Sequence, residues 1–182
     1  MRRHTILHLG LLCCAGALPF LWAPPQYLIN GGIDFMFPIN PSFVFSQHTQ
    51  ILSDVSEVDQ TLKITYLVPY LVTVVALDML GLPLQIVQRI LFGALLVFPG
   101  VSMYVFTRVL SQENESSSKV GCFISALFYM LNPYVAAIWS GGNQFLLFGY
   151  GALPLVLAIV TRAVQNPAQW RRYSVMTSVA SL

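Results

Sequence analysis

Long apolar runs, separated by short polar connections, make up most of this chain. They cover residues 6–23, 86–107, 120–139 and 145–162, and a further run begins at Tyr173. Each complete run is close to the roughly 20 residues that a helix needs to cross a bilayer. The last run stops at Leu182, about half a membrane deep. The pattern predicts an all-α, polytopic membrane protein with a single transmembrane domain over residues 1–182, and we expect it to be the N-terminal piece of a longer protein.

The first run, ILHLGLLCCAGALPFLWA, follows the basic pair Arg2-Arg3. Secretory signal peptides begin in the same way, and AGA at 15–17 resembles a cleavage site. Because the apolar residues continue to Trp22, the pattern favours a retained anchor over a cleaved signal peptide.

Residues 62–80, LKITYLVPYLVTVVALDML, allow two interpretations. They are long enough to cross a bilayer, but they contain Lys63, Pro69 and Asp78. If they do not cross, residues 24–85 form one outer loop with an interfacial or re-entrant helix at 62–80. An acid within an apolar helix is by default a candidate functional residue, and for Asp78 this argument weakens if the helix lies in the interface.

Basic residues accumulate in short cytoplasmic loops, and this rule separates the possible topologies. With the N-terminus inside and residues 62–80 in the interface, seven basic residues face the cytoplasm and two face outward. The seven are Arg2, Arg3, Arg108, Lys119, Arg162, Arg171 and Arg172, and the two are Lys63 and Arg89. If residues 62–80 cross, three are inside and six outside. The charges therefore predict a multi-pass protein of the cell membrane with a cytoplasmic N-terminus, in which residues 111–119 form a cytoplasmic loop.

A third topology, in which residues 62–80 cross and the N-terminus is outside, gives six basic residues inside and three outside. It places the basic pair Arg2-Arg3 on the outer face, so we keep it as the alternative.

Composition narrows the class of protein further. Apolar residues make up 56% of the chain and charged residues only 9%, whereas soluble domains carry about 25% charged residues. The formal charge of +2 is small and dispersed, with no basic stripe that has aromatic residues interleaved in it, so nothing predicts nucleic-acid binding. The three cysteines lack CxxC or Cys/His spacing, which argues against a zinc site or a disulfide framework.

The stretch NGGIDFMFPINPS, residues 30–42, contains the first candidate for chemistry. Gly31-Gly32 permits backbone conformations that other residues avoid, and two prolines stiffen the chain after Asp34. A carboxylate fixed in this way near the headgroups suits a general base or a metal ligand. The alternative is an ordinary turn in which Asp34 is solvated or caps a helix.

Four other polar residues are candidates for binding. His48, the only histidine of the outer loop, could bind a phosphate or shuttle a proton, or could simply be exposed. Arg89 opens the second span, where it could snorkel towards headgroups or hold a lipid-linked phosphate. Asn143 and Gln144, in the SGGNQ turn between two later runs, are uncharged donors suited to a sugar hydroxyl or a phosphate oxygen, and this turn opens on the same face as Asp34 in the favoured topology.

Several short sequence motifs indicate a family resemblance: GGIDFMFPINP, YMLNPY, SGGN and the LP pair in the run that follows. Together with the order of spans and the long outer loop, they make the chain similar to the N-terminal part of GT-C membrane glycosyltransferases. The resemblance is to the large multi-spanning prokaryotic members related to arabinofuranosyltransferase D, and it covers nearly the whole chain.

The resemblance implies an enzyme of the cell envelope, in its full-length form, that transfers a sugar from a polyprenyl-phosphate donor to a hydroxyl acceptor on a glycan or protein. Asp34 would take the acceptor proton, sometimes with the help of a divalent cation. Arg89 would steady the leaving phosphate, and Asn143 and Gln144 would line the sugar pocket. Kinked helices and Asp78 also fit a transporter or flippase fragment, and a non-catalytic membrane scaffold is a third interpretation.

Overall fold

The computed structural model describes residues 2–22, 24, 26–28, 37–49, 70–111, 116–140 and 145–166. Within these ranges every regular element is a helix, so the expected all-α class is confirmed for this part of the chain. The helices are α1 (Arg2–Ala15), α2 (Pro19–Trp22), α3 (Pro41–Thr49), a helix at Tyr70–Met79, α5 (Leu84–Leu110), α6 (Ser116–Met130), α7 (Pro133–Ser140) and α8 (Phe145–Gln165).

In the part of the chain that the structure describes, three helical segments are long and apolar enough to cross a membrane: Leu84–Leu110, Lys119–Ile138 and Leu146–Gln165. Two further apolar segments, Thr5–Leu21 and Tyr70–Met79, are shorter. Many large apolar side chains on these helices face outward, which suits a lipid surrounding better than water. The exact set of spans stays a prediction.

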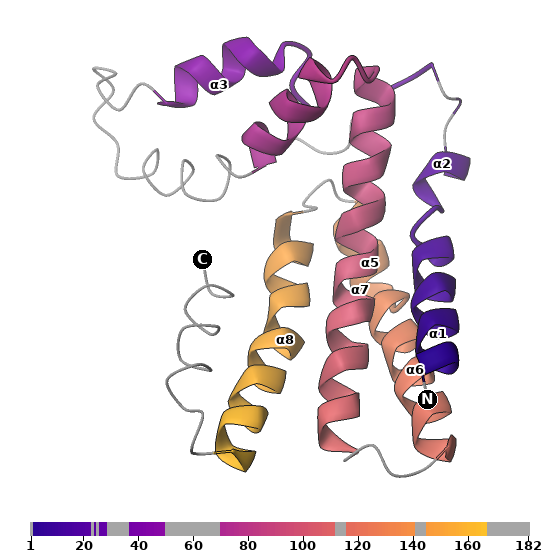
Figure 1. Cartoon of the computed structure of the whole chain (residues 1–182). Helices are drawn as coiled ribbons and strands as arrows, with labels where there is room; N and C mark the ends of the chain where they lie inside the picture. The colour runs from indigo at the N-terminus through magenta and orange to yellow at the C-terminus, as the bar shows by residue number, and fades with distance from the viewer. Residues whose placement is uncertain are drawn as a thin grey trace.

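α5 is the central helix of the bundle, and it contacts α1, α6 and α8 (Figure 1). α1 and α6 run antiparallel to α5, whereas α8 runs parallel to it (Figure 1). The main apolar core forms where these helices meet. Its fully buried members are Leu12, Leu96, Tyr104, Ala126, Met130, Val135 and Leu147, and Phe92 is nearly as enclosed.

Small residues let the helices approach closely at two places. A Cβ atom on Gly93 of α5 would lie 2.6 Å from the backbone oxygen of Gly16. A Cβ atom on Gly151 of α8 would lie 2.5 Å from Cδ1 of Phe98. Close backbone contact through small residues is a common way for helices to pack in membranes, where apolar burial gives little driving force between them.

Two of the predicted runs do not form single continuous helices. The first is interrupted by a turn at residues 16–18 between α1 and α2. The run at 120–139 breaks at Leu131 and Asn132, between α6 and α7. Asn132 Oδ1 accepts a hydrogen bond from the backbone N–H of Val135 at 3.0 Å and so caps α7, whose first residue is Pro133. α6 itself begins at Ser116, so part of the expected 111–119 loop is helical.

α3 and the Tyr70–Met79 helix lie at one end of the bundle, beside the start of α5 (Figure 1). The Tyr70–Met79 helix and the start of α5 share a second apolar cluster, in which Phe37, Val74 and Val87 are buried. Leu28, Tyr70, Leu77, Leu82, Leu84 and Leu91 pack around it. Of the expected interfacial helix at 62–80, residues 70–79 are helical, and 62–69 lie outside the described residues.

Candidate functional site

Most of the predicted site residues lie outside the part of the chain that the structure describes. Asp34, Asn143 and Gln144 are among them, so their roles stay predictions. His48 belongs to α3, but its side chain is outside the description. The site is therefore built from Arg89 and from the described residues on either side of these segments.

Arg89 is buried, with 1% of its surface exposed. Its Nη2 donates a hydrogen bond to the backbone oxygen of Pro24 at 2.7 Å and another to that of Tyr27 at 3.4 Å. Hydrogen bonds from a charged donor are stronger than neutral ones, and a buried guanidinium needs them. Arg89 thus ties the start of α5 to the chain that follows α2, and it does not extend outward as a snorkelling side chain. Its predicted contact with a phosphate stays a prediction.

Arg108 connects the end of α5 to the start of α1. Its Nη1 donates a hydrogen bond to Oγ1 of Thr5 at 3.1 Å, and its guanidinium lies 5.9 Å from the ring centroid of Tyr104. Arg89 and Arg108 are 19 residues apart on α5, which corresponds to about 28 Å along the helix axis. This length is close to the roughly 30 Å thickness of a bilayer hydrocarbon core.

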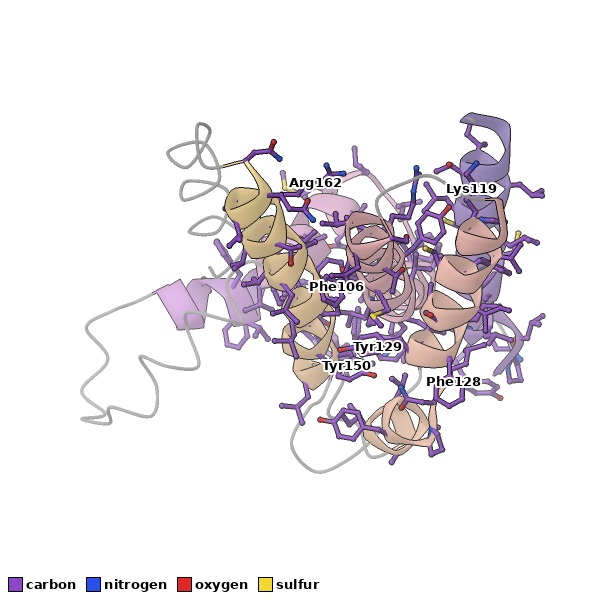
Figure 2. All side chains as sticks on the ribbon, turned by 90° about the horizontal axis from the view of Figure 1, so that it is seen from below. Phe106, Lys119, Phe128, Tyr129, Tyr150 and Arg162 are labelled. Carbon is purple, nitrogen blue, oxygen red and sulfur yellow. The ribbon has the colours of Figure 1, made fainter. Side chains whose placement is uncertain are left out.

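Tyr129 of α6 and Tyr150 of α8 form a reciprocal clasp between these two helices. Their rings stack with centroids 4.1 Å apart and an interplanar angle of 6° (Figure 2). The Tyr129 hydroxyl donates to the backbone oxygen of Tyr150 at 3.0 Å, and the Tyr150 hydroxyl to that of Tyr129 at 3.2 Å. The clasp satisfies polar groups inside apolar helices, where an unpaired group is costly.

Asn132 joins the tyrosine clasp to the break between α6 and α7. Its Nδ2 donates to the Tyr150 hydroxyl at 2.8 Å and to the backbone oxygen of Tyr129 at 2.8 Å. Because Asn132 Oδ1 also accepts a hydrogen bond from the N–H of Val135, both the oxygen and the nitrogen of its side-chain amide are hydrogen-bonded. Counting from Lys119, Asn132 lies 13 residues further along, or about 20 Å for a helical rise.

Sequence reasoning missed this clasp and a second polar contact near Arg108. The buried His8 has its Nδ1 3.2 Å from the Tyr104 hydroxyl, and its ring stacks on Phe123 at 4.8 Å. The sequence feature that could have indicated these contacts is the presence of polar side chains within apolar runs, such as Tyr129 and Asn132 at i, i+3 spacing. Which helix each one would meet depends on contacts between distant parts of the chain.

An apolar hollow of about 250 Å³ lies beside the break between α6 and α7. It is lined by Leu18, Pro19, Leu21, Leu96, Met130, Leu131, Asn132, Val135 and Ala136. The turn between α1 and α2, helix α5 and the break between α6 and α7 all contribute to its walls. Its walls suit an apolar group and offer no charged side chain.

Among the described side chains, no group of three or more His, Cys, Asp or Glu residues could hold a metal ion. Asp34, which the resemblance implies as a metal ligand, is outside them, so the divalent cation stays a prediction. No protein-family model, curated protein or solved structure matches this chain. The resemblance to GT-C glycosyltransferases therefore depends on the residues of this chain alone.

Proposed function

We propose that this chain is the membrane part of a GT-C-type glycosyltransferase. It transfers a sugar from a polyprenyl-phosphate donor to a hydroxyl acceptor on the extracytoplasmic face, with Asp34 as the general base. The observation that carries the proposal is the packing of Leu28 and Phe37, the described residues on either side of Asp34, beside the start of α5, the central membrane-length helix.

Leu28 and Phe37, on either side of the Asp34 segment, pack in the same apolar cluster as Val87. Val87 lies two residues before Arg89 on α5. Asp34 is three residues from Phe37, and a chain spans at most about 3.6 Å per residue, or about 11 Å here. This short reach supports the proposal that Asp34 acts at the end of the bundle marked by Arg89.

The distribution of charge supports an extracytoplasmic position for this end. Described basic residues near the opposite end of the bundle are Arg2, Arg3, Arg108, Lys119 and Arg162, at or near the ends of α1, α5, α6 and α8 (Figure 1). The contact between Arg108 and Thr5 brings the start of α1 to the end of α5. By the positive-inside rule, that end faces the cytoplasm. The antiparallel pairing of α1 with α5 also favours the topology in which residues 62–80 do not cross.

In the proposed mechanism, Asp34 takes the proton of the acceptor hydroxyl as that oxygen attacks the anomeric carbon, and the polyprenyl phosphate leaves with its bonding electrons. Arg89 positions the chain that leads into the Asp34 segment through Pro24 and Tyr27. Asn143 and Gln144, which lie between α7 and α8 in the sequence, would hydrogen-bond the sugar. His48, on α3, would act at the phosphate.

Sugar transfer by the full-length protein tests this proposal, with radiolabelled polyprenyl-phosphate arabinose and polyprenyl-phosphate mannose as donors. General-base catalysis contributes about 100- to 10,000-fold, so Asp34→Asn is expected to lose at least about 100-fold in transfer rate. Asp78→Asn, which removes a half-buried acid near the same end, is the matched control and is expected to keep the wild-type rate. Full transfer by Asp34→Asn would exclude Asp34 as the base.

A second candidate function, transport, is favoured by one observation. The break between α6 and α7 lies about 20 Å along the helix from Lys119, within the apolar thickness rather than at its edge. Transporters bind substrate at such broken helices. In proteoliposomes, a transporter would move the lipid-linked sugar between leaflets without transfer to an acceptor, and Asp34→Asn would leave this movement intact. Donor binding with neither activity would indicate a non-catalytic scaffold.

A further inference from the structure

Positive charge gathers at the end of the bundle opposite Arg89. Figure 2 views the molecule from this end, with Lys119 on α6 and Arg162 on α8. Arg108 belongs to the last turn of α5, and Arg2 and Arg3 begin α1. Among the described residues, Asp78 is the only acid, and it lies on the Tyr70–Met79 helix at the other end of the bundle.

The connecting segments do not cancel this asymmetry. The segment between α5 and α6 contains Glu113 and Glu115, and the segment after α8 contains Arg171 and Arg172. In the sequence, the helix ends on this side and the segments joined to them contain seven basic and two acidic residues, and the remainder of the chain contains two basic and five acidic residues. Among the described residues, five of the six basic residues belong to this end and the one acid, Asp78, belongs to the other, although the formal charge of the whole chain is only +2.

The described cations stand at the edge of the apolar bundle. Arg108 is half-buried between Thr5 and the Tyr104 ring, so its charge is held at one depth. Lys119 and Arg162 are also half-buried, so their aliphatic stems cover apolar surface. Long basic side chains in this setting extend their charged ends to the lipid headgroups.

A shallow hollow of about 330 Å³ lies between the end of α5 and the start of α6. Its lining consists of Thr107, Leu110, Ser111, Gly121, Cys122 and Ser125. Lys119 lies one helical turn before Cys122, so both are on the same face of α6. A cation thus stands beside a hollow with mainly apolar walls, at the depth where a phospholipid carries its phosphate above its acyl chains.

We propose that the basic end of the bundle binds anionic phospholipid selectively. The phosphate pairs with Lys119 and Arg108, and the first carbons of an acyl chain occupy the hollow beside Gly121. Charge complementarity favours an anionic lipid over a zwitterionic one, with about 1 kcal/mol, or about fivefold in affinity, for each basic residue near the surface. This inference requires that the helices cross a bilayer, but it does not depend on sugar transfer.

Native mass spectrometry of the full chain tests the proposal, in mixed micelles with equal amounts of phosphatidylglycerol and phosphatidylcholine of matched chain length. The wild type is expected to retain phosphatidylglycerol in preference, and the preference is expected to fall as salt shortens the Debye length from about 10 Å at 0.1 M to about 3 Å at 1 M. Equal retention of the two lipids by the wild type would overturn the proposal.

Three variants separate a specific site from a general effect of charge. Lys119→Gln is expected to lower the preference about fivefold, whereas Lys119→Arg keeps it. Lys63→Gln removes the same charge outside the basic end and is expected to have no effect. An equal loss in Lys63→Gln and Lys119→Gln would contradict the site.

Gly121→Leu tests the hollow without a change of charge. Gly121 lines the hollow, and a Cβ atom added there meets nothing within 4 Å, so the first carbon of the new side chain has room and the rest is expected to extend into the hollow. We expect the single variant Gly121→Leu to retain less phosphatidylglycerol than the wild type. Unchanged retention in Gly121→Leu would show that the hollow takes no part.

Discussion

Arg89 donates a hydrogen bond to the backbone oxygen of Pro24 at 2.7 Å, although the two residues are 65 positions apart. This contact fixes where the chain emerges after α1 and α2, and it does so at the start of the longest apolar helix. Arg108 makes the corresponding contact with Thr5 near the other end of α5. The chain that follows α2 is therefore attached to α5 by a buried cation at Pro24 and Tyr27.

Replacement of Arg89 by leucine is expected to destabilise the fold by about 2–3 kcal/mol, because the oxygens of Pro24 and Tyr27 lose a charged donor. Arg162→Leu removes a half-buried cation at the other end of the bundle and should change stability by no more than about 0.5 kcal/mol. Thermal unfolding of both variants in the same detergent measures the difference. Equal stability of the two variants would mean that the Arg89 contacts contribute little.

Removal of the Tyr150 hydroxyl is expected to loosen the link between α6 and α8. Tyr150→Phe keeps the ring stack but loses the bonds with Asn132 and with the Tyr129 oxygen. Interhelical hydrogen bonds in membranes contribute about 0.6 kcal/mol on average and up to about 1.7 kcal/mol, so we expect a loss within this range. Tyr134→Phe, at a site that is 54% exposed, is the matched control.

A double-mutant cycle distinguishes a reciprocal clasp from two independent bonds. Tyr129 and Tyr150 stack on each other and each donates a hydrogen bond to the other's backbone oxygen. The double variant Tyr129→Phe with Tyr150→Phe should therefore lose less stability than the sum of the losses in the two single variants. Additive losses would argue against coupling between the two tyrosines.

Two glycine-to-alanine changes are expected to have opposite effects. Gly93→Ala would place a Cβ atom 2.6 Å from the Gly16 oxygen, so α1 must move away from α5. Gly149→Ala meets nothing within 4 Å, and alanine stabilises a helix interior by about 1 kcal/mol relative to glycine. Unfolding in denaturing detergent should therefore be easier for the first variant and harder for the second. A stabilised Gly93→Ala variant would contradict the close contact.

Stability should fall at alkaline pH because of Tyr70. Burial raises the pKa of Tyr70 in the folded state above the usual value near 10. The unfolded chain therefore loses this proton first, so the favourable contribution is complete below about pH 10 and is lost as the pH rises further. Tyr70→Phe should show a smaller loss of stability between pH 9 and pH 11 than Tyr27→Phe, which changes an exposed side chain. Identical pH profiles would place Tyr70 in contact with water.

The apolar runs determined the helices of this protein, because a run of about 20 apolar residues favours a helix whatever it later packs against. α5, α6 and α8 lie where the runs predicted helices, and the order of residues alone places basic side chains near the ends of these helices. The Asn-Pro pair at 132–133 marked a disturbance of the third run, but a kink and a full break have the same local sequence.

Tertiary structure alone decided which residues meet. The sequence presented Arg89 as a cation at the start of a span, and only folding brought Pro24 and Tyr27 to it. Tyr129 and Tyr150 belong to different apolar runs, and nothing local to either one indicates the other. Such contacts depend on how helices far apart in the chain cross. Close approach at small residues such as Gly16 and Gly93 helps to determine the crossing, and their spacing along the chain does not reveal that they touch.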